Sequence, residues 1–423
     1  MKPISFGIYT LGCRVNQYES DRLHALLVRK GMVAGDFSEK CDVYLINTCT
    51  VTSESDRKCR QMIRRAHQTN PDAKIYVCGC FSEMFPEEMK KFPFVTRFIG
   101  TRDKDSLVNM IAADLSLPPL SCSEGGLILP QTERARAFIK IEDGCDNRCA
   151  YCIIPFARHE VVSRGEDNIV AEAALIAKDR KEIVLTGIET ASYGKDRRDV
   201  SLLSLFSKLS AINGIERIRC GSLEPTLLSP SFVDAVADFP KVMPFYHLSM
   251  QSGSDSVLRR MRRRYNTAQV KEKLQYLNQK IEKASYAYDL IVGFPGETEE
   301  EFTETLDFVS QTQPIRAHIF TYSRRKGTEA EKMNGQIPEE VKIARSKALS
   351  SLCEEIAENK VKEEIKRGTE YLLLTEQTKN GITTGHTENF LTVSLKKEVP
   401  PNTLIKIVLT EWQNGQIFAD PIE

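Results

Sequence analysis

The sequence predicts an α/β protein with three domains: a doubly wound α/β domain, an incomplete (β/α)6 barrel and a small β-barrel. Near the N-terminus, short apolar runs alternate with helical stretches, and a longer series of β-α repeats follows them. The C-terminal segment contains short alternating runs separated by Asn-Gly and Pro-Pro-Asn turns. The expected domain boundaries are 1–115, 135–367 and 368–423, with a linker rich in Pro and Gly over 116–134.

The first domain places three cysteines after expected strands. Strands are expected at residues 4–10, 43–47, 74–77 and 95–99, and the first three run into Cys13, Cys49 and Cys80. Because the carboxyl ends of parallel strands meet at one edge of a sheet, we expect these thiols to converge there. Three thiolates suit an iron-sulfur cluster that keeps one iron open. Cys78 is the alternative to Cys80, which we prefer because it falls at the strand end.

The other cysteines of the chain are expected to be small buried hydrophobic residues. They are Cys41, Cys59, Cys122, Cys220 and Cys353. Twelve cysteines without a signal peptide indicate a reducing compartment, where clustered thiols more often hold metal than form disulfides. No apolar run approaches the about 20 residues that span a membrane. We therefore expect a cytoplasmic protein that makes no membrane contact.

The second domain carries a denser cysteine group. Its strands are expected at residues 137–141, 182–186, 217–222, 245–250, 286–292 and 318–322, and function in such barrels gathers at the carboxyl ends of the strands. Cys145, Cys149 and Cys152 follow the first strand within one loop. This spacing suits a second open iron-sulfur cluster. The alternative is a structural zinc site that His159 completes as the fourth ligand.

The cysteine patterns resemble those of a known family. The motif CxxxCxxC after a strand, with Tyr151 before the last cysteine, resembles the signature of radical S-adenosylmethionine (SAM) enzymes. Together with LGC, NTC and GC around the first three cysteines, nearly the whole chain resembles the methylthiotransferases, which join an N-terminal cluster domain, a radical SAM domain and a C-terminal TRAM module. The resemblance implies two [4Fe-4S] clusters and SAM as cofactors. One departure is His159, where relatives usually have Gly.

Further motifs in the barrel match the family's cofactor-binding positions in order. SAM needs hydrogen-bond partners for its amino acid end and a flat apolar neighbour for its adenine. The residues that the resemblance assigns to it are Tyr151, Gly187, Ser222, Glu224, Gln251 and Ile291. Each motif alone is also compatible with a tight turn or a helix cap, and Ser254 with Asp255 is compatible with a simple N-cap.

The resemblance also implies an activity, the insertion of a methylthio group at an unactivated C–H bond of a modified adenosine beside the tRNA anticodon. One SAM would methylate sulfur at the N-terminal cluster, and another would be cleaved to give the radical that removes the hydrogen. The segments TLGCRVNQYES and NTCTVTSESDRKCR are most similar to the branch acting on C2 of N6-threonylcarbamoyladenosine. The other branches act on isopentenyladenosine or on a ribosomal protein. Alternatives from other classes are a zinc-containing RNA-binding protein and an electron carrier.

Nucleic-acid contacts must come from local patches, because Lys plus Arg equals Asp plus Glu at 58 each. We expect two patches, on the helix after Cys49 and on the C-terminal module, whose GHTENF segment resembles the TRAM motif and presents an exposed Phe390. Their residues are Arg57, Arg60, Arg64, Asn389, Phe390, Lys396, Lys397 and Lys406. The run VLRRMRRRY over 257–265 predicts a helix with a basic face that is solvated or binds phosphate. A flavodoxin-like or ferredoxin-like electron donor is expected, and the sulfur donor is unknown.

Overall fold

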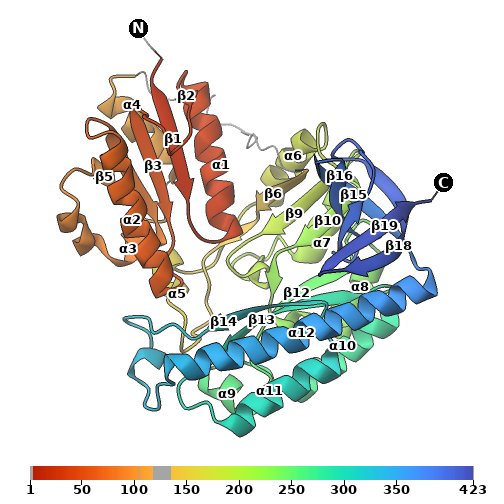
Figure 1. Ribbon diagram of the computed structural model, residues 1–423. Coiled ribbons are helices and arrows are strands. Elements are labelled where there is room, and N and C mark those ends of the chain that lie inside the picture. The colour runs from red at the N-terminus through yellow and green to blue at the C-terminus, as the bar shows by residue number, and fades with distance from the viewer. Residues whose placement is uncertain (1–2, 103, 118–134, 423) are drawn as a thin grey trace.

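The computed structural model describes residues 3–102, 104–117 and 135–422. Figure 1 shows the N-terminal α/β domain and the C-terminal β-barrel on different sides of the central half-open barrel. The predicted fold class is confirmed, including the small closed barrel at the C-terminus. Cys122 and most of the expected linker lie outside the described residues.

The N-terminal domain is a parallel sheet with helices on both faces. Its strand order is β2-β1-β3-β4-β5. The strands are β1 Ser5–Thr10, β2 Val33–Ala34, β3 Val43–Thr48, β4 Lys74–Gly79 and β5 Arg97–Phe98. The helices are α1 Arg14–Arg29, α2 Ser53–Thr69, α3 Cys80–Met84 and α4 Lys104–Asp114. One apolar cluster lies between the sheet and helices α1 and α4, and a second lies under α2, because alternate residues of β3 and β4 point to opposite faces.

The central domain contains the six expected strand positions in two parallel sheets. Their orders are β10-β9-β6 and β11-β12-β13-β14. The expected strand over 217–222 is divided at Gly221 into β10 and β11. The strands are β6 Arg136–Lys140, β9 Glu182–Thr186, β10 Arg217–Cys220, β11 Ser222–Leu223, β12 Phe245–Gln251, β13 Ser285–Val292 and β14 Arg316–Thr321, with the short pair β7 Glu142–Asp143 and β8 Val162–Ser163. The helices are α5 Ile154–Arg158, α6 Glu166–Ile176, α7 Leu202–Ser210, α8 Pro230–Ala237, α9 Asp255–Arg260, α10 Thr267–Lys280 and α11 Glu299–Thr312.

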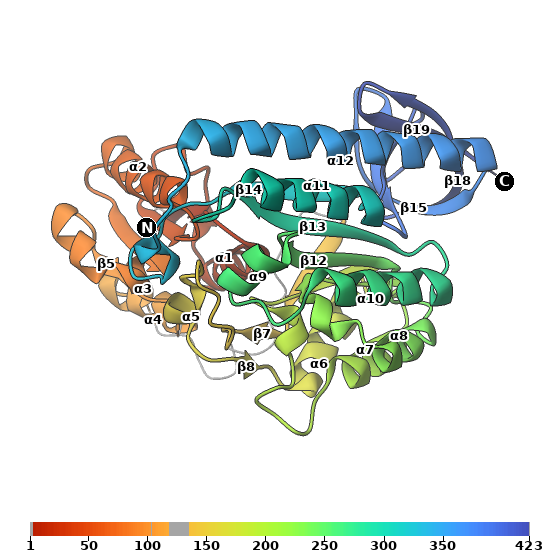
Figure 2. The same cartoon turned by 90° about the horizontal axis from the view of Figure 1, so that it is seen from below.

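The long helix α12, Glu339–Arg367, ends where Gly368 adopts a left-handed conformation with φ +63°, as glycine does readily at helix ends. Figure 2 shows it running along the outside of the barrel from the side of the N-terminal domain to the C-terminal barrel. That barrel closes in the order β15-β16-β17-β19-β18. Its strands are β15 Glu370–Lys379, β16 Ile382–Thr387, β17 Thr392–Leu395, β18 Leu404–Gln413 and β19 Gln416–Pro421. Among the described residues, no helix is both long and apolar enough to cross a membrane.

The C-terminal barrel packs against the amino ends of the central strands, and this contact corrects one prediction. Phe390 is only 8% exposed, and its ring stacks on Phe245 of β12 with 4.5 Å between the ring centroids. Asn389 is also buried, and its carbonyl accepts a hydrogen bond from Ser285 Oγ at 2.6 Å. The expectation of an exposed Phe390 was wrong, because the GHTENF segment is an internal docking loop.

The arginine run over 257–265 is a second correction. Helix α9 ends at Arg260, and Arg262 has a positive φ of 60°, so the run does not continue as one helix. Arg263 is consequently turned inward, and its side chain is only 4% exposed. The basic run is therefore not a uniform solvated face.

Candidate active site

The three N-terminal cysteines lie at one edge of their sheet. Cys13 precedes α1, Cys49 follows β3, and Cys80 begins α3 directly after β4. A Cβ atom at Gly12, where φ is +102°, would come within 2.8 Å of Cys49 Cβ, so the close approach of these two segments requires glycine. Cys78 packs instead into the apolar cluster under the sheet. This placement supports Cys80 as the third ligand.

Burial makes the Cys49 thiol difficult to ionise without a cation. Burial raises the pKa of Cys49 to about 11, and the nearby Cys80 and Cys13 act in the same direction. Iron binding would stabilise the thiolate form, because metal ligation requires deprotonated cysteine. The donor set therefore fits a metal cluster.

The second group lies in the loop after β7, above the barrel strands. Main-chain hydrogen bonds fold this loop, from Cys145 N to His159 O at 3.0 Å and from Cys152 N to Cys149 O at 3.1 Å. Burial, together with a smaller effect of the neighbouring cysteines, raises the pKa values of Cys145 and Cys152 to about 12. The structure brings Cys145, Cys149 and Cys152 together, and this set has the same chemical character as the first.

Each cysteine group receives a hydrogen bond from a buried guanidinium group. Arg158 Nε donates to Cys80 Sγ at 3.3 Å, and Arg263 Nη1 donates to Cys149 Sγ at 3.1 Å. Hydrogen bonds to ligand sulfurs tune the reduction potential of a cluster. Sequence reasoning missed both arginines, since only their tertiary contacts distinguish them from the others.

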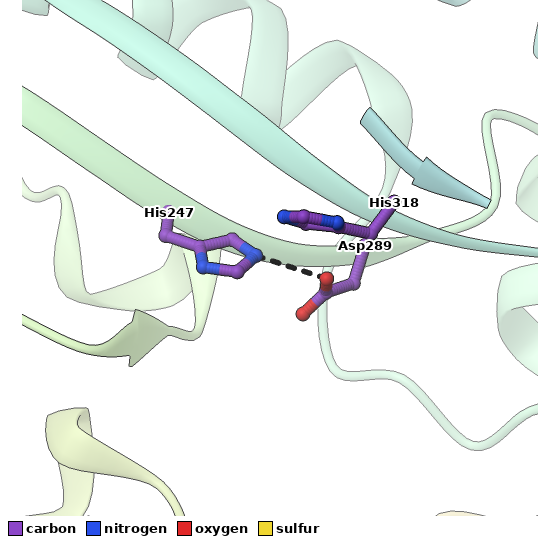
Figure 3. Close-up of side chains that lie close together, drawn as sticks. All are labelled: His247, Asp289 and His318. Carbon is purple, nitrogen blue, oxygen red and sulfur yellow. Dashed lines mark hydrogen bonds and ion pairs between the residues drawn. The ribbon is translucent and has the colours of Figure 1, made fainter. Parts of the chain in front are cut away.

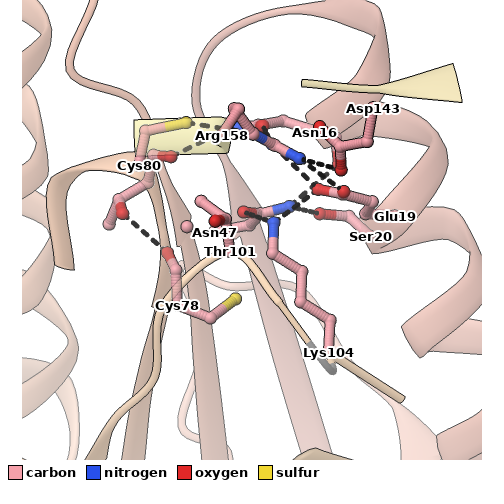
Figure 4. Close-up of polar contacts among 12 residues, drawn as sticks. Asn16, Glu19, Ser20, Asn47, Cys78, Cys80, Thr101, Lys104, Asp143 and Arg158 are labelled. Carbon is pink, nitrogen blue, oxygen red and sulfur yellow. Dashed lines mark hydrogen bonds and ion pairs between the residues drawn. The ribbon is translucent and has the colours of Figure 1, made fainter. Parts of the chain in front are cut away.

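Arg158 also belongs to a buried ionic network between the N-terminal domain and the barrel (Figure 4). Its Nη1 atom lies 2.7 Å from Glu19 Oε1 and 3.0 Å from Asp143 Oδ2, and Lys140 and Lys104 contact Glu19 as well. Burial raises the pKa of Glu19, but Arg158 and the two lysines hold it well below its usual range. The network therefore fixes Arg158, and with it the position of Cys80, relative to the barrel.

Three glutamate side chains, here called the glutamate row, lie in succession at the carboxyl ends of the central strands. Glu189 N donates to Glu142 Oε1 at 2.8 Å, Glu224 N donates to Glu189 Oε1 at 3.1 Å, and Arg263 lies 3.1 Å from Glu224 Oε1. Burial raises the pKa of Glu142 to about 8 and that of Glu189 to about 7. A Cβ atom at Gly187 would lie 1.8 Å from Glu142 Oε1, so this arrangement needs glycine there.

The glutamate row fits the amino acid end of SAM. Glu142 Oε2 is buried and has no hydrogen-bond partner among the described residues, so an acceptor remains available. Carboxylates match the ammonium group of SAM, and Arg263 matches its carboxylate. Sequence analysis included Gly187 and Glu224 but missed Glu142 and Glu189, which the folded strand ends bring beside them.

The remaining predicted cofactor residues lie nearby on the same strand ends and loops. Ser222 begins β11, and Gln251 ends β12 with φ +66°, a conformation sparsely populated by residues other than glycine. Such outliers concentrate at functional sites. Tyr151 and Ile291 pack together against one small apolar cluster that includes Phe294. Their roles in binding SAM stay predictions.

His159 has a backbone conformation that glycine adopts more easily, in line with the glycine that the family resemblance led us to expect there. Its φ and ψ are +63° and −157°, a region that side chains disfavour. Its Nε2 atom lies 3.2 Å from Glu83 Oε1 of the N-terminal domain. This contact engages Nε2 with the N-terminal domain, and His159 does not group with the three cysteines as a possible metal ligand among the described residues, which argues against the zinc alternative.

Apart from the buried Asn389 and Phe390, the expected RNA-binding residues lie on two separate surfaces. Arg57 and Arg60 lie along α2 and pair with Glu54 at 2.5 Å and Glu88 at 3.8 Å, while Arg64 covers the ring of Phe92. A surface pocket on this helix is lined by Arg57, Arg64 and Arg65 together with Gln61 and Gln68. On the C-terminal barrel, the Lys396 side chain is 67% exposed. RNA binding by either surface stays a prediction.

Comparisons with known proteins agree with this arrangement. Residues 5–100 match the model described as uncharacterized protein family UPF0004, and residues 139–309 match the radical SAM superfamily. The threonylcarbamoyladenosine tRNA methylthiotransferase MtaB of Bacillus subtilis is 37% identical over 409 residues, covering 92% of this chain and 90% of that protein. A tRNA-2-methylthio-N(6)-dimethylallyladenosine synthase of Caldicellulosiruptor saccharolyticus is 34% identical, covering 93% and 87%.

A solved structure shows the same fold at much lower identity. The radical SAM methyltransferase TsrM of Kitasatospora setae, solved with cobalamin and a [4Fe-4S] cluster, has a TM-score of 0.58 and 13% identity, covering 91% of this chain and 81% of that chain. The full-length relatives, the two matched domains and the two three-cysteine groups lead to one assignment: the chain belongs to the radical SAM methylthiotransferase family.

Proposed function

We propose that this protein transfers a methylthio group to C2 of N6-threonylcarbamoyladenosine beside the anticodon of tRNA. The observation that carries the proposal is the pair of three-cysteine groups, in a chain whose MtaB relatives match over most of its length. The tRNA-2-methylthio-N(6)-dimethylallyladenosine synthase is nearly as similar to this chain. The test below therefore compares the two modified bases directly.

The chain supplies ligands, positioning and shielding. Cys13, Cys49 and Cys80 would hold one [4Fe-4S] cluster, and Cys145, Cys149 and Cys152 would hold the other, which with SAM would supply the one-electron chemistry that breaks a strong C–H bond. Around the cofactor, Glu142, Glu189 and Glu224 would bind and orient its ammonium group, Arg263 would bind its carboxylate, and Tyr151 would lie beside its adenine.

The partners in this proposal are tRNA, a flavodoxin-like or ferredoxin-like electron donor, and a sulfur donor of unidentified chemistry. A cytoplasmic location follows from the tRNA substrate and from the many unpaired cysteines.

The test is nucleoside mass spectrometry. Anaerobically reconstituted protein receives reductant, sulfide and SAM, with tRNA that carries either threonylcarbamoyladenosine or isopentenyladenosine. A methylthio product from threonylcarbamoyladenosine alone is expected. Product from isopentenyladenosine alone would move the substrate to the other branch, and no product from either would overturn the proposed function.

The two cysteine groups have different roles that two variants distinguish. Cys145→Ala is expected to abolish reductive cleavage of SAM, because it removes a ligand of the cluster beside the cofactor. Cys49→Ala is expected to retain cleavage but to lose methylthio product. Deoxyadenosine and methylthio nucleoside are measured in the same reaction, and equal residual cleavage in both variants would contradict the assignment of roles.

A further inference from the structure

A cluster of ligand-type side chains lies on the concave face of the barrel, away from both cysteine groups. His247, Asp289 and His318 come from the neighbouring strands β12, β13 and β14, and one ligand atom from each lies within 4.8 Å of the others. His247 Nε2 is 2.9 Å from Asp289 Oδ1, and the rings of the two histidines are 5.3 Å apart (Figure 3). Their strand neighbours pack toward the helices, so the three side chains face the barrel interior.

The surroundings of this cluster are strongly cationic. Arg136 and Arg219 point into the same interior and are neutralised by Glu376 at 2.8 Å and Glu182 at 2.8 Å. Arg316, on the same face of β14 as His318, donates only to the hydroxyl of Thr392 at 3.2 Å. No carboxylate of the described residues forms an ion pair with Arg316.

A second unpaired arginine reaches the cluster from the N-terminal domain. Arg14 is the first residue of α1, directly after Cys13, and α1 packs beside β6 at the open edge of the barrel (Figure 1). It is half-buried, and none of the hydrogen bonds or ion pairs found among the described residues includes it. Arg14 interacts electrostatically with Asp289 and His318, so its guanidinium group lies within range of the cluster.

The charge around the cluster disfavours a metal cation. Two histidines and an aspartate are suitable ligands for zinc or iron, but Asp289 is the carboxylate of the cluster and already accepts a hydrogen bond from His247. Two uncompensated guanidinium groups nearby would repel a dication and attract an anion. The arrangement therefore suits an anion, and the imidazole rings of His247 and His318 form one side of the site.

We propose that Arg14 and Arg316, together with His318, bind the carboxylate of the threonylcarbamoyl group of the substrate. This inference rests on the proposed function, because threonylcarbamoyladenosine carries a carboxylate and isopentenyladenosine does not. Arginine recognises a carboxylate by charge-assisted hydrogen bonds. Two residues along β14 from His318, Phe320 is 48% exposed on the same face and offers a flat apolar surface to the purine.

The position of Arg14 also indicates where the base of the substrate would be held. Because Arg14 adjoins Cys13, the substituent that it binds would hold the base between the N-terminal cysteine edge and the barrel. The substituent leaves the purine at N6 and not at C2, so the subsite can grip the substrate without blocking the reacting carbon. Substrate choice would then depend on residues of both domains.

The test measures binding, so that it does not depend on turnover. Fluorescence anisotropy compares two anticodon stem-loops, identical except for threonylcarbamoyladenosine or unmodified adenosine, on the reconstituted protein and on Arg14→Gln and Arg316→Gln. Each variant is expected to lose roughly tenfold in affinity for the modified stem-loop, the typical effect of removing a hydrogen bond to a charged group, and to bind the unmodified one as before. Arg197→Gln, an exposed arginine paired with Asp199, is the matched control.

Four results would overturn the inference. Equal weakening of both stem-loops would mean that the arginines contact RNA phosphates. Weakened SAM binding, measured by equilibrium dialysis, would assign them to the carboxylate of the cofactor. Zinc or manganese that is retained by the wild type but lost from His247→Gln would make the cluster a metal site. If the wild type forms methylthio product from threonylcarbamoyladenosine while both variants keep its affinity ratio, the subsite fails but the proposed function stands.

Discussion

The backbone conformation of His159 is energetically unfavourable for a residue with a side chain. Its φ of +63° and ψ of −157° are accessible to glycine, whereas a side chain there costs on the order of 1–3 kcal/mol. His159→Ala keeps that cost and loses the contact with Glu83, while His159→Gly loses the contact but relieves the backbone. We expect the glycine variant to be more stable than the alanine variant by about 1 kcal/mol, measured by urea unfolding of the cluster-free protein. A more stable alanine variant would contradict this account of the loop.

Glu189 gives a residue-scale prediction about pH. Its folded pKa of about 7 lies above the usual value, chiefly because it is buried and secondly because Glu224 is close. A raised carboxyl pKa means that the folded state holds its proton more tightly, so this group's contribution to stability falls as pH rises from about 4.5 through 7. The ammonium group of SAM favours the ionised form. We therefore expect SAM affinity to increase as pH rises through about 7, and this increase to be smaller in Glu189→Gln.

At the scale of elements, the strand ends were predictable, and their tertiary partners were not. Apolar runs followed by Cys13, Cys49 and Cys80 mark strand ends in the sequence alone, and parallel topology then brings these ends together. Arg158 and Arg263 have no local pattern that separates them from solvated arginines. Each becomes distinctive only through a cysteine more than 70 positions away, Cys80 for Arg158 and Cys149 for Arg263.

Helix α2 tests the RNA-binding interpretation of an element. Reversing Arg57, Arg60 and Arg64 to Glu is expected to weaken tRNA binding by at least tenfold at low salt and to reduce the slope of log affinity against log salt, because fewer counterions would be released. Filter binding at several salt concentrations measures both. Reversal of Arg197, Lys208 and Lys280, which pair with acidic residues on the outer layer of the barrel, is the matched control. An unchanged slope would remove α2 from the RNA interface.

At the scale of the whole molecule, the C-terminal barrel is an integral part of the architecture. Its docking loop joins main-chain carbonyls to barrel arginines, with Arg217 Nη1 donating to His386 O at 2.9 Å and Arg219 Nη2 donating to Thr387 O at 2.7 Å. Composition alone could not reveal this, because Phe390 in GHTENF is equally compatible with an exposed RNA contact. Contacts of this barrel with RNA are therefore expected on its other sides, where Lys396 is exposed.

Phe390 tests whether this docking holds the domains together. Its ring packs on Phe245 and lies under the guanidinium groups of Arg136 and Arg219, at 5.1 Å and 4.9 Å from their central carbons, so Phe390→Ala removes contacts on both sides of the interface. We expect hydrogen exchange to rise both in the docking loop and at the start of β12. Leu395→Ala, which opens a cavity inside the C-terminal barrel, should raise exchange in that barrel alone. If hydrogen exchange at the start of β12 stays slow in Phe390→Ala, as in Leu395→Ala, the arginine hydrogen bonds hold the two barrels together and the aromatic stack does not contribute.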